Sequence, residues 1–256
     1  MAVTAGESPV GPHAHPAFGD SSDPSGVAGN LRQSPHLGRP GQTGPPHWRT
    51  LRRPADAPGR PPSQDGEEVA ATTQSQHPFP VAANTLDRAF TVEAPNRVWA
   101  GDLTYIWTLE GWLYLAVLLD LYSRRVVGWA MGQRLTVDLA ERALTMALAN
   151  RAPTAGLLHH SDRGSPYAAT SYQRVLAAYG LRPSMSRKGN CWDNACVESF
   201  FGTLKRELVY HRRYATREEA TQDIFEYIEV FYNRQRRHST LGYHSPAEYE
   251  AKAAVA

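Results

Sequence analysis

Apolar and polar residues alternate along residues 97–131 in a pattern that predicts three antiparallel strands. β-Branched and aromatic residues recur at every second position over residues 97–107, which is typical of a strand. After a turn at Gly111, residues 112–120 form a nearly continuous apolar run that suits a central strand buried on both faces. A third strand is predicted at residues 126–131, after a Ser-Arg-Arg turn.

The apolar spacing then becomes helical. Thr136 can cap a helix over about residues 136–150, because the apolar residues that follow it fall on one helical face. A short strand is predicted at residues 157–161. The next helix starts at Thr170, which forms a capping-box pair with Gln173. Residues 182–184 are predicted to form an edge strand.

Two long helices are predicted in the last third of the chain. Asp193 or Asn194 can cap the first, which reaches about residue 209, and Thr216 and Glu219 form a capping-box pair at the start of the second. The resulting order is βββαβαβαα. Three antiparallel strands followed by alternating helices and strands indicate a ribonuclease-H-like α/β fold, with a mixed five-stranded sheet and flanking helices.

The first 86 residues differ in composition from the rest of the chain. They hold 14 of the 19 prolines and 10 of the 20 glycines, and Leu, Ile, Val and Phe together supply 11 of the 86 residues. That share is below the roughly 20% usually needed for a core. Residues 1–86 are therefore predicted to be disordered or non-native, residues 87–250 to form the folded domain, and residues 251–256 to form a tail.

Apolar run length and cysteine content narrow the class of protein. No run of about 18 apolar residues is present, which excludes a membrane-spanning helix. The N-terminus lacks a basic region followed by an apolar one, and the chain has two cysteines, Cys191 and Cys196. An intracellular protein with reduced thiols is therefore expected. The two cysteines lack a second pair of ligands, so a zinc site is not expected.

Three carboxylates are predicted to lie on rigid elements. Asp102 lies within an apolar strand, Asp162 directly follows the strand at residues 157–161, and Glu198 lies one turn into a helix. Burying an unpaired charge costs several kcal/mol, so such positions call for a partner. Two Mg²⁺ or Mn²⁺ ions about 3.5–4 Å apart can be held by a few carboxylates while phosphate oxygens complete their shells. This arrangement suits phosphodiester chemistry on nucleic acid.

The spacing of these acids sharpens the prediction. Asp162 is 60 positions after Asp102, and 35 residues separate Asp162 from Glu198. Lys205 lies two helical turns after Glu198 and on the same helix face. The acid spacing and the basic residue together resemble the catalytic core of the DDE transposases and retroviral integrases.

The resemblance covers about residues 85–250 and is closest to the transposases of bacterial insertion sequences that are made from two overlapping reading frames. The chain resembles the second-frame product. A small departure is Pro166, where relatives often carry a polar residue. The matching stretches are VWAGDLTY at 98–105, HSDRGS at 160–165, DNA at 193–195, ESFF at 198–201, and YN, RH and LGY between 232 and 243.

The resemblance implies that Asp102, Asp162 and Glu198 bind two Mg²⁺ ions, for which Mn²⁺ can substitute, and cut and join DNA 3′ strands without a covalent protein intermediate. Lys205 would grip a phosphate of the terminal DNA. The implied partners are the terminal inverted repeats of the element, target DNA, a first-reading-frame helix-turn-helix protein or its fusion, and further copies of the chain on DNA. The expected location is the bacterial cytoplasm, in association with the nucleoid and with no membrane.

Other titratable residues near these positions are interpreted as structural. Asp120 ends a strand before a turn, where Asp commonly satisfies backbone amides. Asp138 and Asp193 suit the starts of helices, where a carboxylate caps the first turn or complements the helix dipole. His159 and His160 lack further zinc ligands at a suitable spacing, so structural or supporting roles are favoured.

Two basic segments are candidate DNA contacts, through phosphates rather than bases. The aromatic residues Trp192, Tyr232 and Tyr243 are interleaved with them, as on many nucleic-acid-binding surfaces. A solvated charged face is the alternative interpretation. The candidate residues are Arg187, Lys188 and Asn190 in the first segment, and Arg234, Arg236, Arg237 and His238 in the second.

Two other functions compete with catalysis of transposition. Residues 1–68 lack the helical period of a DNA-binding segment. An alternative interpretation is therefore that the chain is an inactive or truncated remnant, which acts only as a DNA-binding or regulatory protein. A misplaced start or a shifted frame would explain the same residues. A glycosidase that uses two of the carboxylates explains neither the third acid nor the basic segments.

Overall fold

The computed structural model describes residues 77–188 and 190–253. Of residues 1–86, which are predicted to be disordered or non-native, residues 1–76 lie outside the described residues, as does the end of the predicted tail. Residues 77–86 pack on the domain, since Leu86 is buried in one part of the core and Phe79 packs against the other. The packed region therefore begins by residue 77, earlier than the boundary expected at residue 87.

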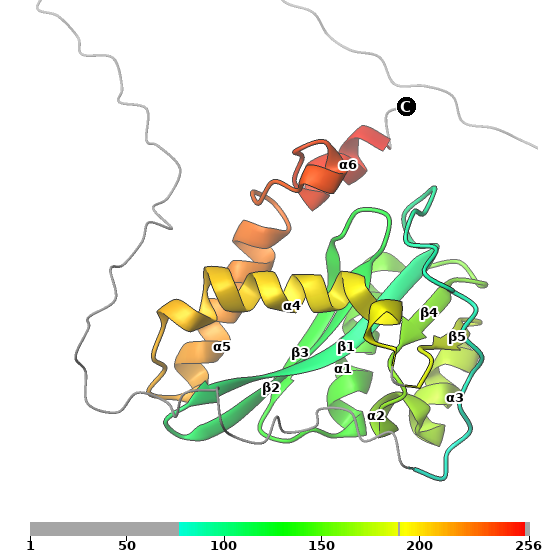
Figure 1. Ribbon diagram of the computed structural model, residues 1–256, viewed down its shortest axis with the longest axis horizontal. Helices are drawn as coiled ribbons and strands as arrows, with labels where there is room; N and C mark the ends of the chain where they lie inside the picture. Colours follow the sequence, from blue (N-terminus) through cyan, green and yellow to red (C-terminus); the bar gives the residue numbers. More distant parts are fainter. Residues whose placement is uncertain (1–76, 189, 254–256) are drawn as a thin grey trace, which may run out of the picture. The chain divides into compact units, whose positions relative to one another are not determined.

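A mixed five-stranded sheet forms the centre of the domain (Figure 1). β1 (Val98–Thr108), β2 (Gly111–Asp120) and β3 (Val126–Gly132) are antiparallel neighbours, as predicted. β4 (Leu158–Ser161) pairs in parallel with β1, and β5 (Arg182–Met185) pairs in parallel with β4. The strand order β3-β2-β1-β4-β5 places β1 in the middle of the sheet.

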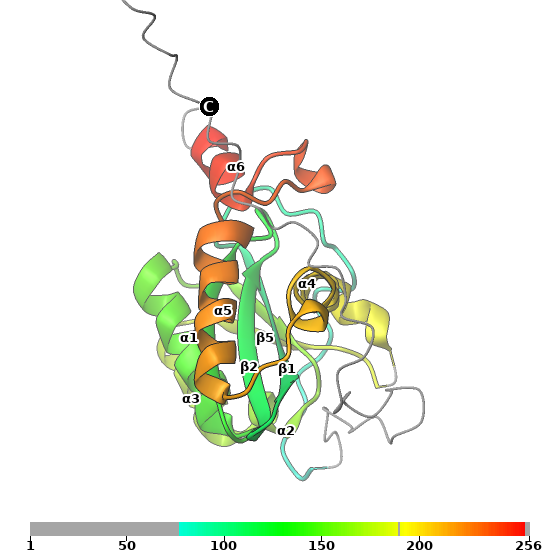
Figure 2. The ribbon, with the colours of Figure 1, turned by 90° about the vertical axis from the view of Figure 1, so that its left-hand side faces the viewer.

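Helices cover both faces of this sheet (Figure 2). α1 (Val137–Arg151), α2 (Ser165–Ala168) and α3 (Thr170–Ala178) pack on one face. α4 (Ala195–Glu207) and α5 (Arg217–Glu226) pack on the other face. The predicted α/β fold with a mixed sheet and flanking helices is therefore observed.

The starts of α1 and α5 have the predicted side-chain caps. Thr136 Oγ1 accepts a hydrogen bond from the Leu139 amide at 3.3 Å, and Thr216 Oγ1 accepts one from the Glu219 amide at 3.1 Å. Such caps contribute about 1 kcal/mol each, because they satisfy amides that have no partner within the helix. The beginning of both helices is thus set locally by the sequence.

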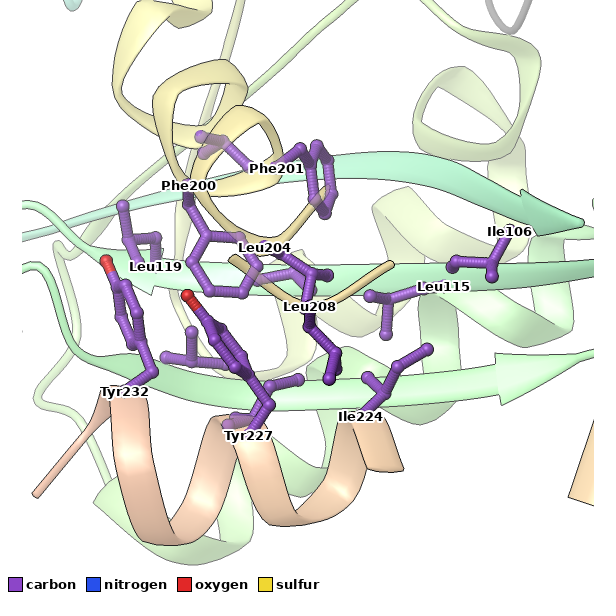
Figure 3. Close-up of a cluster of buried hydrophobic side chains, with 14 of the residues drawn as sticks. Ile106, Leu115, Leu119, Phe200, Phe201, Leu204, Leu208, Ile224, Tyr227 and Tyr232 are labelled. Carbon is purple, nitrogen blue, oxygen red and sulfur yellow. The ribbon is translucent and has the colours of Figure 1, made fainter. Parts of the chain in front are cut away.

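The core under α4 and α5 is rich in aromatic side chains (Figure 3). Leucines and phenylalanines of α4 meet alternate residues of β1 and β2, and tyrosines that follow α5 close the cluster. Each fully buried side chain of this size contributes about 1.5–3 kcal/mol, so α4 is held firmly on the sheet. The labelled members are Ile106, Leu115, Leu119, Phe200, Phe201, Leu204, Leu208, Ile224, Tyr227 and Tyr232.

The region after β4 differs from the prediction. The short helix α2 begins at Ser165, with Pro166 in its first turn, where the fixed φ of proline is tolerated. The predicted capping box of Thr170 and Gln173 is wrong, because α3 has no side-chain cap. The side-chain amide of Gln173 instead donates to the Tyr167 carbonyl at 2.7 Å, since α2 ends where that cap was expected.

The chain after α5 also differs from a plain helix. Residues Tyr227–Tyr232 form a π-helical segment, in which the Asn233 amide donates to the Ile228 carbonyl at 3.1 Å. The Asn233 side chain pairs with both backbone groups of Val126 in β3, at 2.9 and 3.0 Å. A π-turn contains one more residue than an α-turn, so it shifts the residues that follow it around the helix axis. This shift accompanies the buried contact of Asn233 with Val126.

The last helix, α6 (Pro246–Ala253), was not predicted. It is tied to the domain by Glu250, which accepts hydrogen bonds from Arg125, Arg151 and Ser123 at 2.8–2.9 Å. The part of the chain that the structure describes contains no helix with the length and apolar character needed to cross a membrane.

Candidate active site

The pairing of β1 with β4 brings the first two predicted acids side by side. Gly101 is paired in parallel with Ser161, so the next residues along the two strands, Asp102 and Asp162, occupy neighbouring positions. Neighbouring strands lie about 4.8 Å apart. Asp162 follows the last residue of β4, and the carboxyl ends of strands are where open α/β sheets place their sites.

Asp102 lies on the face of the sheet that α4 covers. Successive strand residues face opposite sides, and Ala100 and Ile106, which share a face with Asp102, belong to the core under α4. α4 carries Glu198 in its first turn and Lys205 in its last. The helix therefore presents a third carboxylate and a cation to the edge formed by the first two acids.

Charge interactions show that the four groups gather at one place. Burial raises the pKa of Asp102 well above its usual range, and the charges of Asp162 and Glu198 raise it further. The Leu103 amide, which donates to Asp102 Oδ1 at 2.7 Å, lowers this pKa, and the Lys205 ammonium also lowers it. The structure thus brings together all three acids and the lysine that the sequence singled out.

Glu198 and Lys205 differ in their surroundings. Glu198 is exposed on α4, and partial desolvation raises its pKa. Desolvation lowers the pKa of Lys205, while the charge of Asp102 raises it. Lys205 Nζ lies 5.0 Å from the centroid of the Tyr105 ring, within the range of a cation–π contact. Tyr105 was not a candidate in the sequence, because this contact depends on how α4 crosses β1.

Gly164 fixes the carboxylate of Asp162. The Gly164 amide donates to Asp162 Oδ1 at 2.8 Å. A Cβ atom at position 164 would lie 2.9 Å from the same oxygen, closer than ordinary contacts allow. A larger residue at this position would displace the carboxylate, so the glycine of the HSDRGS stretch is part of the site.

His159 and His160 are buried and neutral. Burial lowers the pKa of His159 to about 3 and that of His160 to about 4. His159 Nε2 pairs with the Tyr172 hydroxyl at 2.9 Å, and the two ring nitrogens of His160 pair with the hydroxyls of Ser184 and Ser186 at 3.0 and 3.1 Å. These contacts agree with the supporting roles inferred from the sequence.

The donors at the site fit a hard divalent cation in their chemistry. All three are carboxylates, the ligands that Mg²⁺ and Mn²⁺ prefer. The pKa of Asp102 is raised by burial and by repulsion from Asp162 and Glu198. A cation held among the three carboxylates would relieve this repulsion. Within residues 77–188 and 190–253, no group of three or more His, Cys, Asp or Glu side chains stands in a ready coordinating arrangement.

Asp120 and Asp138 have the structural roles inferred for them. Asp120 is buried and accepts hydrogen bonds from the backbone amides of Asn96 and Tyr122 at 2.7 and 2.8 Å. Asp138 lies in the first turn of α1 and forms an ion pair of 3.2 Å with Arg142 on the helix surface. Neither carboxylate belongs to the acidic site.

Asp193 is not the helix cap that the sequence suggested. α4 follows Asn194, which makes no side-chain cap. The Asp193 carboxylate is buried and accepts five hydrogen bonds of 2.8–3.0 Å, three from Arg187 and one each from Arg88 and Asn84. The pKa of Asp193 lies well below its usual range, mainly because Arg187 donates hydrogen bonds to its carboxylate. Asp193 therefore joins the loop before α4 to a distant segment of the chain.

The first basic segment is partly committed to internal contacts. The Arg187 guanidinium is held by two carboxylates, at 2.8 and 3.1 Å, and Asn190 Oδ1 accepts a hydrogen bond from Arg88 at 2.8 Å. Lys188 and Trp192 are exposed. Of this segment, the lysine and the tryptophan are therefore best placed to meet a ligand.

The second basic segment is divided in the same way. Arg236 pairs with both oxygens of Glu207 at 2.7–3.0 Å. His238 packs edge-on against Tyr232, and burial lowers the pKa of His238 to about 4. Tyr232 is buried in the core and is not available to a base. The exposed cations of this segment are Arg234 and Arg237.

Two family models match the chain, and several curated relatives are similar to it over about 70% of its length. Residues 92–191 and 198–253 match models that are both described as integrase core domain. The 31 kDa protein of insertion element IS600 from Shigella sonnei is 56% identical over 182 residues, which are 71% of this chain and 67% of that protein. The transposase InsF for insertion sequence IS3A from Escherichia coli strain K12 is 49% identical over 176 residues, 69% of this chain and 61% of that protein.

A solved structure supports the same grouping at the level of the fold. A chain of the simian T-cell lymphotropic virus intasome superposes with a TM-score of 0.54 at 19% identity, over 70% of this chain and 61% of that chain. The predicted ribonuclease-H-like fold is confirmed. The chain spans about two thirds of the length of the curated relatives. It belongs to the bacterial insertion-sequence transposases of the IS3 type, which carry an integrase core domain.

Proposed function

We propose that the chain catalyses metal-dependent cleavage of DNA 3′ strands at the ends of an insertion sequence and their transfer to new phosphates. Its family supports DNA transposition as the reaction. The observation that carries the proposal is the parallel pairing of β1 with β4, which makes Asp102 and Asp162 neighbours. The charges of Glu198 and Lys205 also act on Asp102.

The three acids would hold the divalent cations, two Mg²⁺ ions in the complete site with Mn²⁺ as a substitute. Bound cations of this kind activate an attacking hydroxyl and stabilise the leaving oxygen of an in-line displacement. The chain orients two of the ligands through its backbone, because the Leu103 amide holds Asp102 and the Gly164 amide holds Asp162. Glu198, exposed on α4, completes the set.

Cations near the site and in the segment after α5 would bind the DNA backbone. Lys205 is the cation beside the acids, and Lys188, Arg234 and Arg237 are exposed. Phosphate contacts of this kind position DNA without reading its sequence. The other candidate residues contact side chains of the chain itself, so they would hold the two basic segments in shape rather than bind DNA directly. These residues are Arg187, Asn190, Arg236 and His238.

The proposed partners are those that the family resemblance implies. The DNA substrates would be the terminal inverted repeats of the element and a target duplex, and several copies of the chain would assemble on DNA to hold two ends together. A first-reading-frame helix-turn-helix protein, or its fusion to this chain, would recognise the ends. The protein would act on this DNA in the bacterial cytoplasm, in association with the nucleoid.

An inactive remnant is not favoured by the structure. The neighbouring strand positions of Asp102 and Asp162, the charges of Glu198 and Lys205 that act on Asp102, and the glycine that accommodates the Asp162 carboxylate support an active enzyme. A DNA-binding remnant would need none of this arrangement. Two carboxylates would suffice for a glycosidase, which accounts for neither Glu198 nor Lys205.

Removal of divalent cations is expected to abolish cleavage and joining reversibly. The purified chain is incubated with a duplex that carries an element end, in Mg²⁺, in Mn²⁺ and in excess chelator, and the products are separated on a denaturing gel. A branched DNA that mimics the joined product is a second substrate, because exchange of one phosphodiester for another is reversible and the branch requires no end recognition. Activity that persists in chelator would overturn the proposed chemistry.

Replacement of Lys205 by Ala is expected to weaken binding of DNA and to lower the salt dependence of binding by about one counterion. Lys205→Arg should keep most of the affinity, because charge and the contact with the Tyr105 ring are retained. Fluorescence anisotropy over a range of salt concentrations measures both effects, with Lys252→Ala on α6 as the control. An unchanged salt slope in Lys205→Ala would rule out the phosphate contact.

A further inference from the structure

Three aromatic side chains form a row at the end of the β1–β2 hairpin. The ring of Tyr105 packs edge-on against Trp112 at 4.7 Å between centroids, and Trp112 packs edge-on against Trp107 at 4.8 Å. Trp107 and Trp112 are 43% and 36% exposed. We call Tyr105, Trp112 and Trp107 the aromatic row.

The aromatic row lies outside the two hydrophobic clusters of the described residues. Trp107, Trp112 and Tyr105 are absent from the clusters that α4 and α5 or α1 and α3 cover. Contiguous exposed apolar surface commonly marks a binding site. The two cores therefore do not account for the ring surface that the row leaves exposed.

The row lies on the face of the sheet opposite to Asp102, and Lys205 links the two around the edge of β1. β4 pairs with β1 from Val98 to Gly101, so the part of β1 that carries Tyr105 lies beyond this pairing. Lys205 Nζ stands 5.0 Å from the centroid of the Tyr105 ring and also interacts with the charge of Asp102. One lysine thus connects the acids to the aromatic row.

The charge around the row suits an anionic ligand. The nearby carboxylate of Glu110 accepts a hydrogen bond from the Arg217 amide at 2.9 Å and lies 3.9 Å from the Arg217 guanidinium. This negative charge is therefore balanced by the first residue of α5, and Lys205 supplies the cation at the Tyr105 end. Single-stranded nucleic acid is bound by this combination of stacking aromatic rings and cations that meet the backbone.

We infer that the aromatic row is a stacking platform for unpaired bases at the end of the DNA strand held in the active site. The inference rests on the proposed function, because it needs DNA beside Asp102. Edge-on packing leaves ring surface of both tryptophans open to solvent, and a base has an apolar face of matching kind. Bases that leave the duplex at the active site would pass around the edge of β1 that Lys205 crosses and would stack along the row, while Lys205 holds the backbone.

Binding of two DNAs by the full chain tests this platform. The probes are a blunt duplex and the same duplex with a short run of unpaired thymidines at its 3′ end, and fluorescence anisotropy gives the two affinities. The wild type should bind the frayed duplex more tightly. Trp107→Leu should lose about tenfold in affinity for the frayed duplex, as expected for one lost stacking contact, and little for the blunt one. The double variant Trp107→Leu with Trp112→Leu should lose more.

Two control variants separate stacking from other effects. Trp107→Phe retains an aromatic face and should keep the preference for the frayed duplex, whereas Tyr179→Leu removes an exposed aromatic ring on α3 and should change neither affinity. Circular dichroism checks that each variant is folded. Equal losses on both DNAs, or full binding of the frayed duplex by the double variant, would overturn the platform.

The outcomes also separate the platform from the proposed function. A wild type that transfers strands but does not distinguish the two DNAs would overturn the platform and leave the proposed function in place. A wild type that binds neither DNA would overturn both. If the double variant instead lost self-association while its DNA affinities were unchanged, the row would be an interface between copies of the chain, and the platform would be wrong.

Discussion

Asp102→Asn is expected to abolish strand transfer while DNA binding stays largely intact, and Asp162→Asn and Glu198→Gln should do the same. Each change keeps the size of the side chain and removes a negatively charged oxygen ligand. Mutation of groups that merely orient metal ligands typically costs about 10- to 100-fold, so loss of a ligand should cost more than about a hundredfold in rate. Gel assays of strand transfer and anisotropy of DNA binding measure the two properties separately.

Asp102→Asn should lose activity without losing stability. The pKa of Asp102 is raised in the folded chain by burial and by the two neighbouring acids. An acid whose pKa rises on folding opposes folding at a pH where it is ionised in the unfolded chain. The asparagine variant should therefore be as stable as the wild type or more stable at neutral pH without metal, as measured by thermal unfolding.

A surface acid provides the control for these variants. Asp138 is exposed and paired with Arg142 on α1, so Asp138→Asn should keep both strand transfer and stability. Wild-type rates of strand transfer in any one of the three acid variants would remove that residue from the site. A large loss of stability in Asp102→Asn would contradict the unfavourable electrostatics on which its placement rests.

Much of the sheet and the acidic site could be predicted, because their signals are local. The period of two in β1 and the apolar run of β2 are set by burial on the sheet faces, and both strands form where they were expected. Asp102 and Glu198 interrupt apolar surfaces of their own elements, which made them visible without any tertiary information. The family resemblance added the spacing that connects them with Asp162.

The role of Asp193 could not be predicted, because its partners are remote in the sequence. Asn84 and Arg88 lie 109 and 105 positions away from it. A buried carboxylate with distant partners looks, in the sequence alone, like an ordinary helix cap. For the same reason the segment that carries Asn84 and Arg88 was assigned near a boundary, although Leu86 is in the core.

The roles of the residues after α5 could not be predicted either, because they also depend on contacts with residues remote in the sequence. Asn233 belongs to a stretch that matches the family, yet its buried contact with both backbone groups of Val126 explains its presence without DNA. Tyr232 was counted among aromatic residues available to bases and is instead part of the core. Polar and aromatic residues near basic segments therefore divide into buried and exposed sets that sequence pattern does not distinguish.

Asp193→Asn is expected to destabilise the chain and to loosen the loop before α4. The asparagine removes the charge that three basic and amide side chains share, and a buried carboxylate of this kind contributes about 2 kcal/mol when its partners are themselves half exposed. Urea unfolding at neutral pH measures the loss. Hydrogen exchange of the Arg187 amide, which donates to Asp193 Oδ2 at 2.9 Å, should become faster. Strand transfer should fall as well, because the loop leads into the helix that carries Glu198.

The pH dependence of this difference distinguishes a lost charge from a general packing defect. The folded pKa of Asp193 is lowered, chiefly by hydrogen bonds from Arg187. Its contribution is therefore fully present above the unfolded pKa of about 3.9 and is lost as pH falls toward the folded value. The stability difference between wild type and Asp193→Asn should be constant from pH 7 to about pH 5 and should shrink below about pH 4. Asp138→Asn should show no comparable difference at either pH, and a loss in Asp193→Asn that is independent of pH would contradict the charge interaction.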